Sequence, residues 1–412
     1  MTDRLEPPSS RPCACPDWLA GRLREAGGAV PFASYMAWVL HDPTHGAYGA
    51  GRLRIGPRGD FATAPSLGPE FASLLAPQLW DWLESLGPGP LALVETGPGE
   101  GSLALQLARH LAAQRPDLAN RTTLVLVEPN AGMAERQRRL LQASPLPCRW
   151  ASWQELAAAP VQGVVLAHEV LDALAVERIV WDGARWRRQL VSLDEADPAR
   201  PLLRLEPGEP LAPQALAQLD ALGLAPGTQP RPPGWSTELH PGLGPWLAAC
   251  GQALRAGYLL VIDYALEARR YYASQRAAGT LMAYRAQRAS ADPLREPGRW
   301  DLTAHLCIET LQAEAAATGW QVLGQTRQGE ALLALGLAER LYGLQGGSAA
   351  DLADLMARRE ALLRLVDPHA LGDFRWLAFG RSLPPGQAPD PLALRPRFLR
   401  EPAGAGPQDG QG

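Results

Sequence analysis

The chain has 412 residues, of which 46% are hydrophobic and 20% are charged, so it can form two globular domains or one large domain with additions. Its net charge of −4 argues against a nucleic-acid-binding protein, which would carry a basic surface for phosphates. No lysine occurs in the sequence, and this absence excludes a P-loop lysine and a lysine Schiff base.

Cysteine usage and hydropathy indicate the cellular compartment in which the protein resides. The five cysteines are scattered and match no common zinc-binding spacing, and their odd number argues against a secreted disulfide framework. No apolar stretch approaches the ~18 residues that a membrane-spanning helix requires. The first residues are acidic and proline-rich, where a signal peptide needs an apolar run. We therefore expect a cytoplasmic protein with no metal site, no membrane insertion and no nucleic-acid partner.

The chain begins and ends with polar, proline-rich segments. We expect residues 1–16 and 383–412 to be disordered for this reason. Residues 17–90 predict a helical, glycine-rich extension in which one helix begins over 32–38 and another runs over about 69–86.

Four short apolar runs are typical of buried strands, at residues 91–95, 124–128, 163–169 and 257–264. Helical sequences follow the first two runs, and Leu103, Leu107 and Leu111 form an apolar stripe in the first helix. Buried strands that alternate with helices indicate a parallel sheet with helices on both faces. We therefore predict an α/β domain over residues 91–345.

The second half of this domain contains less regular sequence. An insertion spans residues 176–233, where VWDGARWRR predicts a hairpin that turns at Asp182-Gly183 and the remainder is too rich in proline for a regular element. Residues 265–300 are expected to be irregular. Amphipathic stretches cover about 304–318 and 349–365, the second of them within a C-terminal helical segment at 346–382.

A glycine-rich loop, Glu95-Thr-Gly97-Pro-Gly99-Glu-Gly101, follows the first predicted strand. Glycines let the backbone turn sharply and approach a ligand, while the next helix offers unpaired N–H groups. The third glycine comes one position too early for the dinucleotide fingerprint. Glu95 can attract the ammonium of S-adenosylmethionine, and the loop amides can hold its carboxylate. The loop therefore favours S-adenosylmethionine, with a dinucleotide as the alternative.

Further acidic residues end the second and third predicted strands. Glu128 is placed where a carboxylate accepts hydrogen bonds from ribose hydroxyls, unless it simply faces water. His168, Glu169 and Asp172 follow at the carboxyl edge of the sheet, where open α/β folds bind ligands. A helical turn would place Glu169 and Asp172 on one face. The alternative is a pair of acids that complement a helix dipole.

Six motifs between about residues 31 and 341 resemble those of the MidA-like methyltransferases, whose mitochondrial members methylate arginine during complex I assembly. In chain order they are GPRGDFATAP, ETGPGEG, AHEVLDAL, LLVIDY, GTLMAY and DLTAH. The most specific are GDFxTxP (Gly59, Asp60, Phe61, Thr63, Pro65), ExxD (Glu169, Asp172), GTLxxY (Gly279, Thr280, Leu281, Tyr284) and DxTxH (Asp301, Thr303, His305).

The resemblance implies a Rossmann-like class I methyltransferase fold, with a mostly parallel seven-stranded sheet, an N-terminal helical extension and an insertion before the last parallel strands. It also implies S-adenosyl-L-methionine as the methyl donor and an arginine of a protein as the acceptor. A respiratory complex I subunit is the candidate substrate, and a second copy of the chain is a candidate partner.

The resemblance further implies a set of site residues. The cofactor-binding residues would be Glu95, Gly97, Gly99, Gly101, Glu128 and His168. The family usually has asparagine at position 168, and a neutral imidazole there can still donate one hydrogen bond.

The candidate catalytic residues follow from the chemistry of the acceptor. A guanidinium has a pKa of about 13.8, so it arrives protonated and needs carboxylates to orient it and to receive its proton. Glu169, Asp172 and Asp60 are candidates for this role. His305 is a candidate base, or else a helix cap or a hydrogen-bonding residue of the core. The intact glycine loop favours an active enzyme over a non-catalytic assembly factor that binds S-adenosylmethionine. A small-molecule methyltransferase is the third alternative.

Overall fold

The computed structural model describes residues 13–56, 59–60, 62–225, 231–344, 352–383 and 395–400. The chain forms two compact units. Unit 1 comprises Met1–Phe61, Leu171–Trp246 and Ala265–Glu314, and unit 2 comprises Ala62–Val170, Leu247–Tyr264 and Ala315–Gly412. The sequence predicts one domain over 91–345, whereas in the structure the insertion at 176–233 belongs to unit 1 together with the N-terminal segment.

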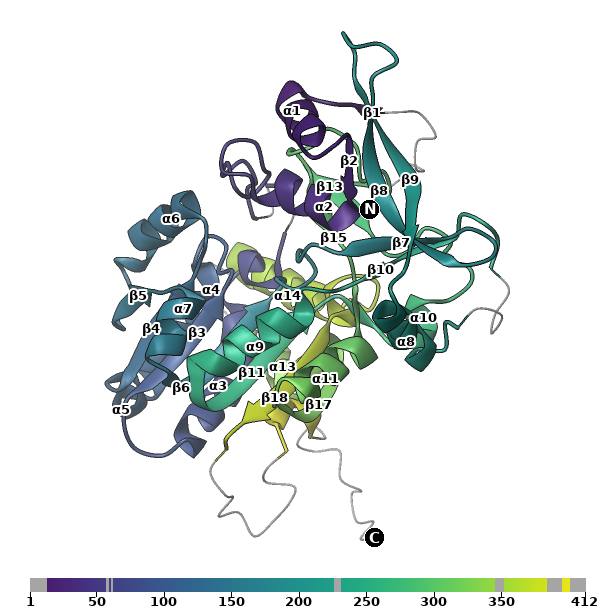
Figure 1. The fold of residues 1–412 in the computed structure, drawn as a ribbon. Coiled ribbons are helices and arrows are strands. Elements are labelled where there is room, and N and C mark those ends of the chain that lie inside the picture. The colour runs from purple at the N-terminus through teal and green to yellow at the C-terminus, as the bar shows by residue number, and fades with distance from the viewer. Residues whose placement is uncertain are drawn as a thin grey trace. The chain divides into compact units, whose positions relative to one another are not determined.

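Unit 2 contains a seven-stranded sheet in the order β17-β18-β11-β6-β3-β4-β5 (Figure 1). Its strands are β3 (Leu91–Thr96), β4 (Thr122–Val127), β5 (Cys148–Trp150), β6 (Val161–His168), β11 (Leu254–Asp263), β17 (Gln321–Arg327) and β18 (Arg375–Arg381). β18 is antiparallel to both of its neighbours, and the other neighbouring pairs are parallel. This arrangement confirms the predicted Rossmann-like, mostly parallel sheet.

The helices of unit 2 include the two that were predicted around the first strand. They are α3 (Glu70–Ser85), α4 (Ser102–Gln114), α5 (Pro116–Ala119), α6 (Ala131–Leu141), α7 (Trp153–Ala158), α12 (Gln328–Ala334), α13 (Leu337–Gly343) and α14 (Leu352–Leu365). Two more, α9 (Leu243–Ala253) and α11 (Ile308–Ala317), contain the points where the chain passes from unit 1 to unit 2. Within the described ranges, no helix combines the length and the apolar character that crossing a bilayer requires.

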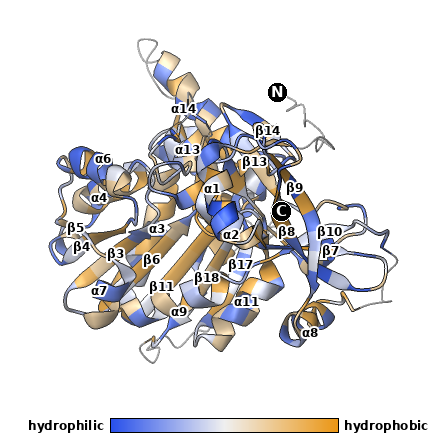
Figure 2. Ribbon diagram, turned by 45° about the horizontal axis from the view of Figure 1, so that its top comes forward, coloured by the Kyte–Doolittle hydropathy of each residue, from blue (hydrophilic) through white to orange (hydrophobic). Residues whose placement is uncertain are grey.

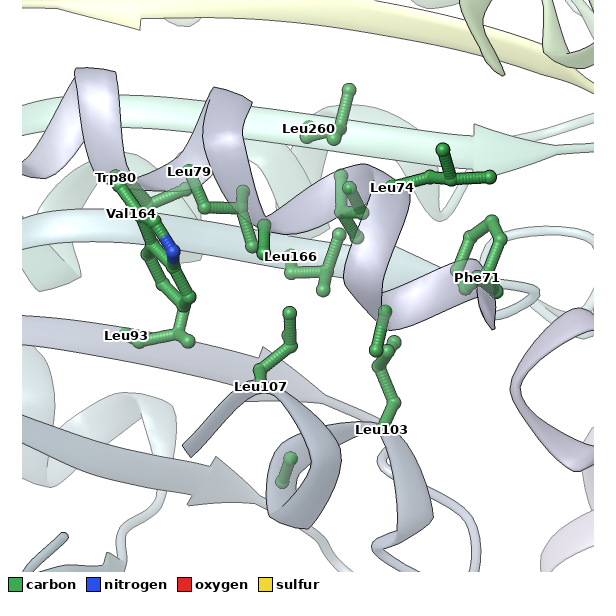
Figure 3. Close-up of a cluster of buried hydrophobic side chains, with 14 of the residues drawn as sticks. Phe71, Leu74, Leu79, Trp80, Leu93, Leu103, Leu107, Val164, Leu166 and Leu260 are labelled. Carbon is green, nitrogen blue, oxygen red and sulfur yellow. The ribbon is translucent and has the colours of Figure 1, made fainter. Parts of the chain in front are cut away.

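Side chains alternate between the two faces of the central strands. On one face they form a buried cluster with α3 and α4 (Figure 3), to which the strands contribute Leu91, Leu93, Leu124, Leu126, Val164, Leu166 and Leu260. The strands are also predominantly orange in Figure 2, as burial on both faces requires. Two residues beyond Leu93 comes Glu95, and two beyond Leu166 comes His168. Both polar side chains therefore lie in phase with the leucine face at the carboxyl edge of the sheet.

Unit 1 is built around an antiparallel sheet in the order β1-β9-β8-β7-β10, with β2 also paired to β8. Its strands are β1 (Cys13–Ala14), β2 (Ala29–Pro31), β7 (Glu177–Trp181), β8 (Trp186–Asp194), β9 (Leu202–Pro210) and β10 (Ser236–Leu239). Smaller sheets contain β12 (Ala265–Leu266), β13 (Met282–Arg285), β14 (Arg288–Ser290), β15 (Asp301–Thr303) and β16 (Leu306–Cys307), and the helices are α1 (Asp17–Glu25), α2 (Phe32–His41), α8 (Pro213–Ala221) and α10 (Ala268–Tyr271). The predicted hairpin is confirmed, because Trp181 pairs with Trp186 across Asp182-Gly183.

Several segments predicted to be irregular form regular elements in unit 1. β1 lies within the N-terminal segment that was expected to be disordered, and it pairs with β9. The proline-rich part of the insertion forms both β9 and α8. Prolines are compatible with both elements, since Pro207 lies on a part of β9 that β1 does not cover and Pro213 is the first residue of α8.

The C-terminal tail was also predicted to be disordered, but residues 395–400 pack against unit 2. Phe398 is 2% exposed, and its ring centroid lies 6.2 Å from that of Trp82 and 5.4 Å from that of Trp376. Arg397 beside it forms an ion pair with Asp81 of α3. The burial of an aromatic side chain between two indoles offsets the entropy lost by ordering this short segment.

Phe398→Ala is expected to destabilise unit 2 by about 3–5 kcal/mol, because it removes a buried aromatic side chain and leaves a cavity. The denaturation midpoint followed by tryptophan fluorescence measures this loss. Met356→Ala is the control, since Met356 is 64% exposed and its truncation should change stability by less than about 0.5 kcal/mol. Equal midpoints for Phe398→Ala and the unmodified protein would contradict the packing described.

Candidate active site

The glycine loop between β3 and α4 turns through left-handed backbone conformations. Gly97, Gly99 and Gly101 have φ angles of +55°, +55° and +86°. A Cβ atom at Gly97 would lie 2.9 Å from Cγ2 of Val170, so a side chain there would meet the segment that follows β6. Glycine is required at these positions because other residues adopt positive φ only with strain. The loop delivers the chain directly to the N-terminus of α4, where backbone N–H groups are available to an anion.

Glu95 is a buried carboxylate at the entrance to this loop. Its side chain is 6% exposed, and Oε2 has no hydrogen-bond partner among the described residues. Burial raises the pKa of Glu95 to about 8, and a hydrogen bond from the backbone N–H of Ala104 acts in the opposite direction. A buried carboxylate with one oxygen left without a partner among the described residues fits a cationic ligand group, such as the ammonium of an amino acid moiety.

Glu128 follows the last residue of β4 and is held by two donors. Its Oε1 accepts the backbone N–H of Asn130 at 2.8 Å, and its Oε2 accepts Nε2 of Gln137 at 3.0 Å. Burial raises the pKa of Glu128, while these two hydrogen bonds and the charge of Arg136 act to lower it. The arrangement keeps a carboxylate at the edge of the sheet, beside the glycine loop.

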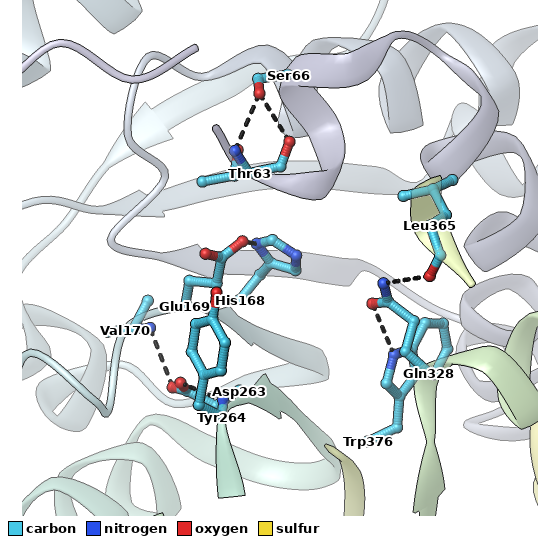
Figure 4. Close-up of polar contacts among 10 residues, drawn as sticks. All are labelled: Thr63, Ser66, His168, Glu169, Val170, Asp263, Tyr264, Gln328, Leu365 and Trp376. Atoms are coloured by element: carbon cyan, nitrogen blue, oxygen red, sulfur yellow. Dashed lines mark hydrogen bonds and ion pairs between the residues drawn. The ribbon is translucent and has the colours of Figure 1, made fainter. Parts of the chain in front are cut away.

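His168 ends β6 and packs against Phe71 of α3, with ring centroids 5.1 Å apart. Its Nδ1 lies 3.5 Å from Oε1 of Glu169, as Figure 4 shows. Burial lowers the pKa of His168 to about 3, so the imidazole is neutral at pH 7. Within the part of the chain that the structure describes, Nε2 has no hydrogen-bond partner.

The helical turn predicted after the third strand does not form. Glu169 has a φ of +52°, which is left-handed, and the segment continues through bends and a turn closed by Leu174 N–H and the carbonyl of Leu171. A left-handed glutamate costs about 1–3 kcal/mol and persists only where its surroundings impose it. Strain of this kind is found at functional sites. The left-handed backbone also gives the Glu169 side chain a direction that a helical residue would not have.

Sequence reasoning missed the residue that holds this strained segment. Asp263 at the end of β11 is fully buried; its Oδ2 accepts Val170 N–H at 3.3 Å and its Oδ1 accepts Tyr264 N–H at 2.8 Å (Figure 4). The N–H of Glu169 also donates to the carbonyl of Ile262 at 2.9 Å. An acid at the end of an apolar strand was the available signal, because such an acid lies at the ligand-binding edge.

Asp60, Asp172 and His305 belong to unit 1. Oδ2 of Asp60 accepts the backbone N–H of Arg54 at 2.9 Å, and its Oδ1 accepts that of Ala286 at 3.0 Å, so this carboxylate joins two loops. Asp172 is 5% exposed, and its carbonyl accepts the N–H of Ala304 at 2.9 Å. Phe61, which follows Asp60 in the GDFxTxP motif, lies outside the described residues.

His305 was expected early in a helix, but it lies in the loop between β15 and β16. Its backbone N–H donates to Oγ1 of Thr280 at 3.1 Å, and this hydroxyl lies 3.2 Å from Oε2 of the buried Glu238. The GTLxxY and DxTxH motifs therefore meet inside unit 1. Burial, followed by the charges of Arg276 and Arg270, lowers the pKa of His305 to about 4.

The structure thus places four elements of the predicted cofactor site in unit 2: Glu95, the glycine loop, Glu128 and His168. Glu169, a candidate catalytic residue, follows His168 directly. These elements lie at the carboxyl ends of the adjacent strands β3, β4 and β6. Among the described residues, no group of His, Cys, Asp and Glu side chains is arranged to hold a metal ion. This sheet, with a buried acid before its glycine loop, is typical of the class of S-adenosylmethionine-dependent methyltransferases.

Comparison with known proteins gives the family. A model of an S-adenosyl-L-methionine-dependent methyltransferase family matches residues 74–326, and the chain belongs to this family. It is similar to the protein arginine methyltransferase NDUFAF7 homolog of Drosophila melanogaster, with 30% identity over 228 residues, 48% of this chain and 52% of that protein. The Xenopus tropicalis mitochondrial protein arginine methyltransferase NDUFAF7 is 26% identical over 344 residues, 76% of this chain and 74% of that protein. The chain thus spans about half the length of the Drosophila relative.

Two solved structures from Burkholderia thailandensis resemble the chain over nearly its whole length. One was crystallised with S-adenosyl-homocysteine and has a TM-score of 0.79 at 29% identity, covering 93% of this chain and 94% of its own. The other, a native crystal structure, has a TM-score of 0.76 at 28% identity and covers 93% of both chains. The family and this likeness confirm S-adenosyl-L-methionine as the cofactor.

Glu95→Gln should stabilise the ligand-free protein and weaken its binding of S-adenosyl-homocysteine. The folded-state pKa of about 8 lies above the unfolded value of 4.5, so the folded protein holds this proton more tightly and loses stability as pH rises between these values. An amide has no such cost. We therefore compare the melting temperatures of the variant and the unmodified protein at each pH. The variant's melting temperature minus that of the unmodified protein should be larger at pH 8.5 than at pH 5.

The same substitution removes the charge that faces the ligand ammonium. We expect an affinity about tenfold lower or worse, the usual scale for a hydrogen bond to a charged group. Titration calorimetry at pH 8.5 measures it. Unchanged affinity would show that the ammonium is bound by other groups.

Proposed function

We propose that the protein transfers methyl groups from S-adenosyl-L-methionine to an arginine side chain of a protein partner. The observation that carries the proposal is Glu169, which follows β6 directly, has a left-handed backbone conformation and has a carboxylate side chain that is only 11% exposed. The mitochondrial relatives named protein arginine methyltransferases support the same acceptor. A guanidinium is a planar cation that retains its proton at pH 7, so a site that methylates it needs negative charge.

In this proposal, the residues around the glycine loop hold the cofactor. Glu95 accepts hydrogen bonds from the ammonium, and the amides at the start of α4 hold the carboxylate. Glu128 accepts hydrogen bonds from the two ribose hydroxyls, and the neutral imidazole of His168 offers a single donor. The bound cofactor supplies an electrophilic methyl group on a sulfonium.

The acceptor side depends on the acids beyond the loop. Glu169 and Asp172 orient the guanidinium and replace its hydration, and one of them receives its proton as the new N–C bond forms and the S–C bond breaks. Oriented carboxylates of this kind act most strongly where water is excluded. Asp60, which accepts hydrogen bonds from the backbone of residues 54 and 286 within unit 1, and His305, neutral at pH 7, are the next candidate proton acceptors.

The partner is a protein, and a respiratory complex I subunit is the proposed substrate. Incubation of the purified protein with S-adenosyl-methionine labelled in its methyl group and with a membrane extract that contains complex I tests this. After acid hydrolysis, we expect label in methylated arginine of a complex I subunit. Label on another amino acid or on small molecules would contradict arginine transfer, and absence of all label would indicate a non-catalytic assembly factor.

Glu169→Gln and Asp172→Asn should each retain affinity for S-adenosyl-homocysteine within about threefold and lose about 100-fold or more of methyl transfer. Each amide keeps the shape of the side chain and removes the charge that orients the acceptor. Calorimetry and the labelling assay are run on the same preparations. Glu135→Gln is the matched control, because Glu135 is 53% exposed on α6 and should affect neither measurement.

Equal loss of binding and transfer would make Glu169 and Asp172 cofactor ligands or structural residues. Full transfer by both variants would mean that other groups hold the acceptor, with Asp60 and His305 tested next.

A further inference from the structure

A buried glutamine links the two parts of the cofactor site. Gln137 lies on α6, and its side chain is fully buried. Its Nε2 donates to the carbonyl of Gly99 at 2.8 Å and to Oε2 of Glu128 at 3.0 Å, and its Oε1 accepts the indole N–H of Trp150 at 2.9 Å. One amide group thus connects the glycine loop, the acid after β4 and the edge strand β5.

Only one orientation of this amide satisfies all three neighbours. The carbonyl of Gly99 and the carboxylate of Glu128 accept hydrogen bonds, and the indole of Trp150 can only donate one. A flipped amide would set its oxygen against two acceptors and its N–H groups against a donor. Both amide hydrogens and one acceptor position are therefore engaged, and the network has a single arrangement.

The position of Gln137 on the helix is otherwise apolar. Met133 and Leu141, four residues before and after it, are buried on the same face of α6. Burying an amide costs free energy unless it is fully hydrogen-bonded, and a leucine or methionine would fill this position without that requirement. Packing alone therefore does not explain a glutamine at this position. Its hydrogen bond to Glu128, which holds that carboxylate in one orientation, does explain it.

We propose that Gln137 is a positioning residue that fixes the carboxylate of Glu128 for the ribose of the cofactor and keeps it in register with the glycine loop. A carboxylate has about four lone-pair positions. Among the described residues, Asn130 N–H occupies one on Oε1 and Gln137 occupies one on Oε2, which leaves one position on each oxygen. Two positions match the two hydroxyls of a ribose. The inference rests on the proposed role of Glu128.

A double-mutant cycle with S-adenosyl-homocysteine tests this inference. Gln137→Met removes both donors at nearly constant volume and should weaken binding about tenfold. Glu128→Ala should weaken binding by a similar factor or more, and the double variant should bind no more weakly than Glu128→Ala alone. Trp150→Phe leaves both donors of Gln137 in place and should change the affinity less than threefold.

Gln328→Met is the matched control. Gln328 is also fully buried in unit 2, donates to the carbonyl of Leu365 at 3.0 Å and accepts the indole N–H of Trp376 at 3.2 Å (Figure 4). Its loss should lower the melting temperature as Gln137→Met does, but leave the affinity within twofold. If Gln137→Met does not fold, Gln137→Glu keeps the acceptor for Trp150, removes the donors and should weaken binding more than tenfold.

The outcomes separate this inference from the proposed function, because no methyl acceptor is used. Affinity of Gln137→Met equal to that of Gln328→Met would overturn the inference. So would losses that multiply in the double variant, since Gln137 would then act independently of Glu128. A protein that shows the expected coupling but labels no arginine would contradict only the proposed function.

Discussion

The alternation of side chains along β3 and β6 determines where the polar groups of the site can lie. One set of positions is occupied by leucine and valine, which are buried under α3 and α4. A strand cannot shift by one residue without exposing this whole set, so its register is fixed. Glu95 and His168 are the polar residues in phase with it at the carboxyl ends of these strands. The hydrophobic core therefore places both polar side chains at the carboxyl edge without any contact specific to a ligand.

The site retains several features that oppose stability. Among the described residues Glu95 is buried without a counter-charge, Glu169 is held in a left-handed conformation, and a Cβ atom at Gly97 would crowd Val170. The surrounding structure offsets these costs through a sheet buried on both faces and through hydrogen bonds such as that from Val170 N–H to Asp263. A ligand group that satisfies Glu95 relieves part of this cost, and the relief contributes to the ligand's affinity, which sets how much a given ligand concentration stabilises the folded state.

Much of unit 2 was predictable because its signals are local. An apolar run, a glycine loop and a helical stripe identify β3 and α4, and motif resemblance supplied the complete sheet. β5, β17 and β18 were not identified. β5 is three residues long, β17 (QVLGQTR) is not an apolar run, and β18 lies in a segment assigned as helical. The burial of Phe398 was not predicted, because it depends on ring contacts with Trp82 and Trp376, which are distant in sequence. Gln137 was detectable in principle as a polar residue on the apolar face of α6, but its partners come from three other segments.

The position of β18 has a consequence for synthesis of the chain. β18 (Arg375–Arg381) lies between β11 and β17 in the sheet, although it is the last of these strands to be made. While the ribosome adds the residues after Asp263, β11 can pair with β6 on one edge, but its other edge has no partner until β18 is made. β17 likewise has no partner in the sheet until β18 is made. An unpaired apolar edge is prone to intermolecular association. Premature termination before residue 375 would leave this edge permanently open, so truncated products should be substrates for chaperones and proteases.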